Sequence, residues 1–156
     1  MYLESTMAQS LAKIYVHMVF STKNREPLLA DSWRDELFQV LGGAANNIGC
    51  QSLTVGGVSD HVHMLIQLAR TLSVSSAIGT IKSNASLWVN QSRGLPDPFH
   101  WQAGYGAFSV SQSSVEKVRE YIRKQPEHHA KISFQDEFRK WLRKYEIEWD
   151  EQYVWD

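Results

Sequence analysis

Two periods of apolar residues organise the first fifty positions of the chain. In residues 13–20, KIYVHMVF, every second side chain faces the same way on a β-strand, which puts Ile14, Val16, Met18 and Phe20 together. In residues 31–49 the apolar positions recur every three or four residues, which predicts a helix with Asp31 as its N-cap. The apolar face of that helix consists of Trp33, Leu37, Val40, Leu41 and Ala44.

The next segments predict two more strands, a second helix and a last strand. Residues 51–59 and 61–69 are strand-like and almost contiguous, which predicts an antiparallel hairpin. Ser73 is the expected N-cap of the second helix. The apolar face of this helix consists of Val74, Ala77, Ile78, Ile81, Ala85 and Trp88. After the loop GLPDP, residues 99–111 are expected to form a strand interrupted by glycines.

This order of elements predicts an α+β fold. The series β-α-β-β-α-β is typical of a ferredoxin-like or RRM-like antiparallel sheet with both helices on one face, here with additional C-terminal helices. The other face must be solvated, covered by the C-terminal helices, or buried against a partner. We expect residues 1–10 to be a flexible N-terminus and residues 11–156 to form a single domain.

Composition narrows the class of protein. With 43% hydrophobic and 21% charged residues among 156, the chain has enough apolar material for a core, which argues against disorder. The net charge of -1 argues against a protein that coats duplex DNA, so any basic surface must be local, and basic residues do gather in residues 113–144. Cys50 is the only cysteine, and no apolar run is long enough to cross a bilayer. We therefore expect a cytoplasmic protein without disulfides or membrane contact.

The strand DHVHMLIQL, residues 60–68, contains two histidines where an apolar strand is expected. His61 and His63 project from the same face, opposite to Val62 and Met64, and hence away from the two predicted helices. Two neutral imidazoles at this spacing can bind one metal ion. The alternative is that both are ordinary polar residues on the exposed side of a half-buried strand.

Residues 113–126, SSVEKVREYIRKQP, predict a helix that carries two further candidates. Ser113 and Glu116 form a capping-box pattern at its start, and Pro126 marks its end. Tyr121 and Gln125 lie four residues apart and thus on one face, where a phenol can act as a nucleophile and an amide oxygen can bind a hard cation. The alternative is that Tyr121 lies at the boundary of the apolar face and that Gln125 is an ordinary residue at the end of the helix.

Four segments together carry a resemblance to a known family. They are HMVFSTKNR, DHVHMLI, WQAGYGAFSVS and EYIRKQPEHH, in this order. From about Lys13 to the C-terminus, the chain resembles the single-tyrosine HUH transposases of the insertion-sequence-200/605 type, in which HUH denotes His-hydrophobic-His. His61-Val62-His63 matches that motif, and Tyr121 and Gln125 match the family's spacing.

The resemblance implies a bacterial or archaeal enzyme that cleaves and rejoins single-stranded DNA near hairpins. His61, His63 and Gln125 would bind Mg²⁺ or Mn²⁺, and Tyr121 would attack the scissile phosphate to give a 5′-phosphotyrosine intermediate. The family is also homodimeric, and the helix with the tyrosine docks either on its own subunit or on the partner.

Other polar residues are candidates for contacts with DNA. Lys23, Arg25 and Lys82 are expected to contact phosphates, and His17 to contact DNA or to support the histidine pair. We expect His128 and His129 to lie on the surface.

Three rival interpretations remain open. They are a non-catalytic nucleic-acid-binding module of the same fold, a domesticated relative that processes repeated hairpins, and a metal-dependent hydrolase that uses water. A hydrolase would form no covalent adduct with DNA.

Overall fold

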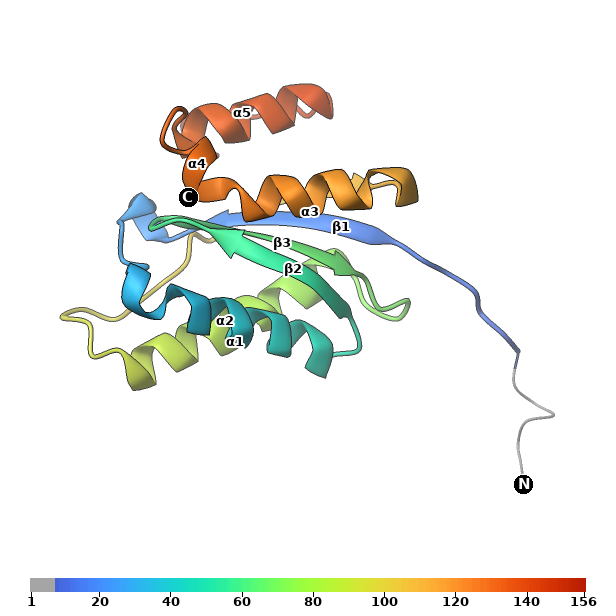
Figure 1. The fold of residues 1–156 in the computed structure, drawn as a ribbon, viewed down its shortest axis with the longest axis horizontal. Coiled ribbons are helices and arrows are strands. Elements are labelled where there is room, and N and C mark those ends of the chain that lie inside the picture. Colours follow the sequence, from blue (N-terminus) through green and yellow to red (C-terminus); the bar gives the residue numbers. More distant parts are fainter. Residues whose placement is uncertain (1–7) are drawn as a thin grey trace.

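The computed structural model describes residues 8–156 and contains a four-stranded antiparallel sheet flanked by helices (Figure 1). The strands are β1 (Tyr15–Ser21), β2 (Gln51–Gly57), β3 (His61–Gln67) and β4 (Gly106–Val110). The helices are α1 (Asp31–Asn47), α2 (Val74–Ser92), α3 (Val115–Arg123), α4 (Gln125–His128) and α5 (Phe134–Lys144), with 3₁₀ turns η2 (Lys23–Arg25) and η3 (Gln112–Ser114). The strand order β2-β3-β1-β4 is that of a ferredoxin-like sheet and confirms the predicted α+β fold.

Two expectations concern the N-terminus and contact with a membrane. The expected flexible N-terminus, residues 1–10, falls mostly outside the described residues, and a domain that starts at residue 11 stays a prediction. Within residues 8–156, each helix is too short or too polar to cross a bilayer.

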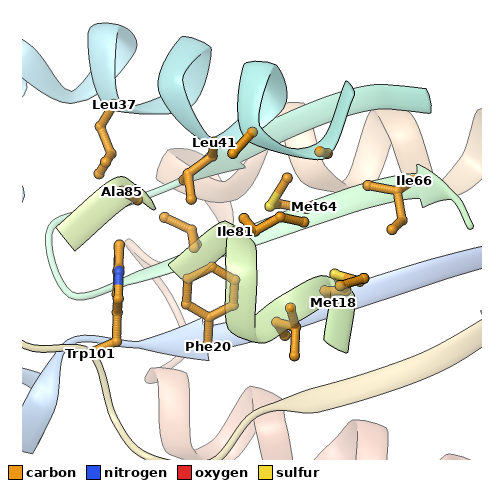
Figure 2. Packing of buried hydrophobic residues seen from close by; sticks show 14 of the residues in the cluster. Met18, Phe20, Leu37, Leu41, Met64, Ile66, Ile81, Ala85 and Trp101 are labelled. Atoms are coloured by element: carbon orange, nitrogen blue, oxygen red, sulfur yellow. The ribbon is translucent and has the colours of Figure 1, made fainter. Parts of the chain in front are cut away.

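One face of the sheet packs on α1 and α2 and forms the main core (Figure 2). Met18 and Phe20 of β1 and Met64 of β3 are completely buried there, and Leu41 of α1 and Ile81 of α2 close over them. The alternation in the two strands therefore assigns their faces correctly. The other side chains of β1 and β3, including all the histidines of these strands, point to the opposite face.

The opposite face carries α3 and α5 of the same chain (Figure 1). Leu65 of β3 packs with Ile122 of α3, whereas Val19 of β1 and Phe108 of β4 pack with Phe138 of α5. Of the three possibilities for this face, coverage by the C-terminal helices is thus the one that the structure adopts. Helix α3 lies over β2 and β3, whereas α5 packs on β1 and β4.

The last strand is shorter than predicted. Residues 99–111 were expected to be one strand, but only Gly106–Val110 forms β4, and Trp101 makes an isolated bridge with Thr22. The pairing of β1 with β4 runs only from Tyr15 and Val110 to Val19 and Gly106. Before Gly106 the chain instead turns Phe99 and Trp101 into the main core.

The predicted helix 113–126 is two helices. Helix α3 ends at Arg123, Lys124 has φ −91° and ψ 14°, and Gln125 opens the short helix α4 with Pro126 in its first turn. Proline has no N–H and clashes with the carbonyl four residues earlier, so α3 cannot continue through it. Tyr121 and Gln125 therefore belong to different helices, which corrects the prediction.

The N-caps predicted from the sequence are confirmed for one of three helices. Ser73 caps α2 as predicted, because its side chain accepts from the backbone N–H of Ser76. Asp31 is the first residue of α1 rather than its N-cap, and it pairs with Arg34 at 2.9 Å. The capping box of Ser113 and Glu116 is absent, because the turn η3 leads directly into α3.

Candidate functional site

His61 and His63 lie in the space under α3 and α5, and one ring nitrogen of each already has a hydrogen-bond partner. Both side chains are completely buried. The Nδ1 atom of His61 lies 2.7 Å from Oδ1 of Asp60, and Nδ1 of His63 lies 2.8 Å from Nε2 of His17. An imidazole whose Nδ1–H donates to such a partner keeps the lone pair of Nε2 available. Both rings therefore present Nε2 to the same space.

Glu137 of α5 occupies the centre of this space. Its Oε1 atom lies 3.1 Å from Nε2 of His63 and 3.5 Å from Nε2 of His61. The Glu137 residue is 1% exposed. A buried carboxylate is stable only when it is well hydrogen-bonded, and its Oε2 atom accepts from the hydroxyl of Tyr121 and the amide of Gln125. Sequence reasoning missed Glu137, because it lies on an ordinary amphipathic helix 74 residues after His63.

His129 is the third imidazole at the centre. Its Nε2 atom lies 3.1 Å from Oε1 of Glu137, and its Nδ1 atom lies 2.7 Å from the carbonyl oxygen of Ile132. The same pattern of a bound Nδ1 and an inward Nε2 thus occurs three times. The expectation that His129 is a surface residue was wrong, because α4 turns the chain back toward the sheet just after Pro126. His128 is partly buried, with Nε2 3.3 Å from Oε2 of Glu137.

Gln125 reaches the same group from the start of α4. Its side chain is completely buried. Its Oε1 atom lies 3.2 Å from Nε2 of His61, and its amide nitrogen donates to Oε2 of Glu137 at 3.1 Å. The break between α3 and α4 therefore does not separate Gln125 from the histidine pair.

Tyr121 reaches Glu137 from α3. Its hydroxyl donates to Oε2 of Glu137 and accepts from the indole N–H of Trp141 at 3.2 Å. Its ring centroid lies 5.7 Å from that of His63. The two oxygens of Glu137 thus face different groups: Oε1 faces three imidazoles, and Oε2 faces the phenol and the amide of Gln125.

The pKa values follow from burial and from this carboxylate. Burial lowers the pKa of His63 to about 4 and that of His17 well below 6.5. Burial also acts to lower the pKa of His61, but hydrogen bonds with Asp60 and Glu137 outweigh it and raise the pKa above 6.5. Burial and the charge of Glu137 raise the pKa of Tyr121, so its hydroxyl keeps its proton at neutral pH.

The carboxyl of Glu137 has a strongly lowered pKa. Burial alone would raise it, but His63, His129 and His61 stabilise the charged form. A fixed negative charge therefore lies among three imidazole nitrogens.

The donor set fits a divalent metal ion. The inward nitrogens of His61, His63 and His129 and a carboxylate oxygen of Glu137 lie within 4.8 Å of one another. Metal bonds of about 2.1 Å place neighbouring donor atoms about 3.0 to 3.4 Å apart, close to the separations between Glu137 and the imidazoles. Each imidazole also has the second partner on Nδ1 that metal-binding histidines typically have.

The structure brings some of the other predicted residues to this site but not all of them. His17 is completely buried and stacks on His63 with centroids 5.1 Å apart, so it supports the pair and has no surface for a DNA contact. Lys82 donates to the carbonyl oxygens of Gln102 and Gly104, and burial lowers its pKa to about 8. Lys23 and Arg25 lie in the turn after β1, which begins where the backbone N–H of Thr22 donates to the carbonyl oxygen of Asp60, and their contacts with DNA stay predictions.

Two solved structures share this fold. A putative transposase from Deinococcus radiodurans superimposes with a TM-score of 0.60, at 21% identity, over 76% of this chain and 98% of that chain. A REP-associated tyrosine transposase, solved bound to a REP hairpin, gives a TM-score of 0.58, at 16% identity, over 81% of this chain and 74% of that chain. At these identities, the likeness shows a shared fold.

The sequence assigns the family. The profile of the family described as "Transposase IS200 like" matches residues 10–125, and the chain belongs to this family. Transposases of the insertion sequence element IS200 from Salmonella typhimurium and Salmonella typhi are each 26% identical over 129 residues, which is 80% of this chain and 84% of each relative. The protein is thus a transposase, and the resemblance found in its sequence is confirmed at the level of the family.

Proposed function

We propose that this transposase cleaves and rejoins single-stranded DNA near hairpins through a covalent bond to Tyr121. One observation carries the proposal: Glu137 joins the hydroxyl of Tyr121 to three imidazoles that can hold a metal ion. A hairpin as the recognition feature is supported by the similar transposase that was solved with a REP hairpin. A domesticated relative that processes repeated hairpins would use the same residues.

The proposed metal ion is Mg²⁺ or Mn²⁺. His61, His63 and His129 would hold it through Nε2 and Glu137 through Oε1, with the carbonyl oxygen of Gln125 as a further donor. Three imidazoles favour Mn²⁺ over Mg²⁺, because Mg²⁺ prefers oxygen ligands. When bound, the ion supplies positive charge that polarises the scissile phosphate.

The chain's own residues supply the nucleophile and its orientation. Glu137 and Trp141 hold the hydroxyl of Tyr121 by hydrogen bonds, and Glu137 in turn contacts His63. The phenolic oxygen attacks phosphorus, the 3′ oxygen of the DNA leaves, and the phenol loses the proton that the leaving oxygen gains. The P–O bond to the 3′ oxygen breaks as a P–O bond to Tyr121 forms, so one phosphoester replaces another and a 3′-hydroxyl can reverse the step without a nucleotide cofactor.

The first test is the adduct itself. Wild-type protein incubated with Mn²⁺ and a labelled single-stranded oligonucleotide that contains a hairpin is expected to yield a protein-DNA species that survives denaturation. EDTA should prevent its formation, because the scissile phosphate then lacks its cation. Denaturing gel electrophoresis measures both results. Cleavage of the oligonucleotide without any adduct would instead indicate a hydrolase that uses water.

We further propose that the protein is a homodimer in which each Tyr121 serves its own subunit. Tyr121 already contacts Glu137 of its own chain, which in turn contacts the histidine pair. A mixture of Tyr121→Phe and His61→Ala subunits is therefore expected to give no adduct, since neither chain has a complete site. An adduct from the mixture would show that the tyrosine acts on the partner. Light scattering that finds a fully active monomer would contradict the dimer.

A further inference from the structure

Tyr121 is the exposed part of a buried site. His61, His63 and Gln125 are 0% exposed and Glu137 is 1% exposed, so these side chains have almost no surface for contact with DNA. Tyr121 is only partly buried, and two hollows of about 500 Å³ each meet at its side chain. A phosphate that approaches Tyr121 must therefore enter through one of these hollows.

The two hollows lie on either side of Tyr121. The α3–α5 hollow is lined by Lys117, Tyr121, Glu137, Lys140, Trp141 and Lys144, among others. The α3–α4 hollow is lined by Lys117, Tyr121, Lys124, His128 and Lys131, together with Glu120 and Glu127. Because Lys117, Tyr121 and His128 border both, the hollows adjoin at the phenol.

The lysines of these hollows are available for phosphates. Lys117, Lys131, Lys140 and Lys144 are all exposed. Within residues 8–156, none of these four has a carboxylate within ion-pair distance, whereas Lys124 pairs with Glu120 at 3.5 Å. The chain as a whole has a net charge of -1, so this local excess of unpaired positive charge stands out from the rest of its surface.

An aromatic side chain lies beside the lysines of the α3–α5 hollow. Trp141 is partly exposed there, its indole N–H donates to the hydroxyl of Tyr121 at 3.2 Å, and the ammonium of Lys144 lies 4.9 Å from its ring centroid. Single-stranded nucleic acid is bound by just this combination of basic groove and aromatic platform, because its bases are free to stack. Paired bases of a duplex are not free to do so.

We infer that one DNA strand runs through the α3–α5 hollow, passes Tyr121 and leaves through the α3–α4 hollow. Lys117 and Lys140 contact phosphates next to the scissile one, and Trp141 stacks on a neighbouring base. The inference rests on the proposed function, since it places the substrate of the same site. It assigns the strand to residues of α3 and α5 rather than to Lys23, Arg25 or Lys82.

The test measures binding without cleavage. Full-length wild-type protein and the double variant Lys117→Glu/Lys140→Glu are titrated into a labelled, unstructured single-stranded oligonucleotide in EDTA, and fluorescence anisotropy is recorded at several salt concentrations. The variant is expected to bind at least about 10-fold more weakly. The slope of log K against log salt should fall by roughly 1.4, because each single-strand phosphate contact contributes about 0.7.

A matched control separates a specific path from general charge. Lys13→Glu/Arg70→Glu changes the net charge equally at two exposed residues that line neither hollow, and it should bind within about threefold of wild type. Equal losses in both variants, unchanged binding by the first variant, or tighter binding of a duplex of the same sequence would overturn the inference. Binding as expected without any adduct in Mn²⁺ would overturn the proposed function alone. All the substituted residues are exposed, so thermal unfolding should be unchanged.

Discussion

Replacing Tyr121 with Phe is expected to abolish the covalent protein-DNA adduct, with a loss of cleavage of at least roughly a thousandfold. The substitution removes only the oxygen that attacks phosphorus. The ring keeps its place beside His63 and Trp141. Because the metal donors stay in place, binding of DNA and of Mn²⁺ should remain close to that of wild type. Denaturing gels measure the adduct, and anisotropy measures binding.

Tyr105→Phe is the matched control for this experiment. Tyr105 is 38% exposed and lies beside the hollow that contains Lys82, not at the histidines. This variant should form the adduct at the wild-type rate. If Tyr121→Phe still forms an adduct, another residue is the nucleophile. If it loses DNA binding as well as the adduct, the role of Tyr121 is structural.

Replacing Glu137 with Gln is expected to weaken Mn²⁺ binding by roughly 100-fold or more. Loss of a partner behind a metal ligand typically costs 10- to 100-fold in affinity, and Glu137 would be a charged ligand itself. Gln keeps the size of the side chain but removes the negative charge that lies among His61, His63 and His129. Calorimetric titration of Mn²⁺ into the protein measures the affinity without any DNA.

Asp136→Asn is the control on the same helix. Asp136 precedes Glu137, but its carboxylate is exposed and pairs with Arg139 at 3.0 Å. Affinity for Mn²⁺ should be unchanged in this variant. Unchanged affinity in Glu137→Gln would remove Glu137 from the proposed donors and leave His61, His63, His129 and Gln125 as the metal site. A thermal unfolding curve for each variant shows whether the buried site still folds.

Features that depend on local sequence were predictable, whereas contacts between distant segments were not. Alternation and helical spacing predicted the faces of β1 and β3, because side-chain direction depends on position within one element. They also placed His61 and His63 on the correct side of the sheet. They failed where the structure of a segment depends on distant neighbours. Residues 99–105 pair beside β1 only through the isolated bridge between Trp101 and Thr22, and Pro126 ends α3 before Gln125.

The sequence by itself determined the order of the elements, the α+β fold, the family resemblance, and four of the side chains that meet at the site: His61, His63, Tyr121 and Gln125. Only the tertiary structure decided that α4 and α5 fold back over the sheet, and hence that His129 and Glu137 join them. The physical reason is that α5 docks through apolar residues such as Phe138 on Val19 and Phe108. A one-dimensional pattern can reveal that such a helix has an apolar face, but not which surface that face covers.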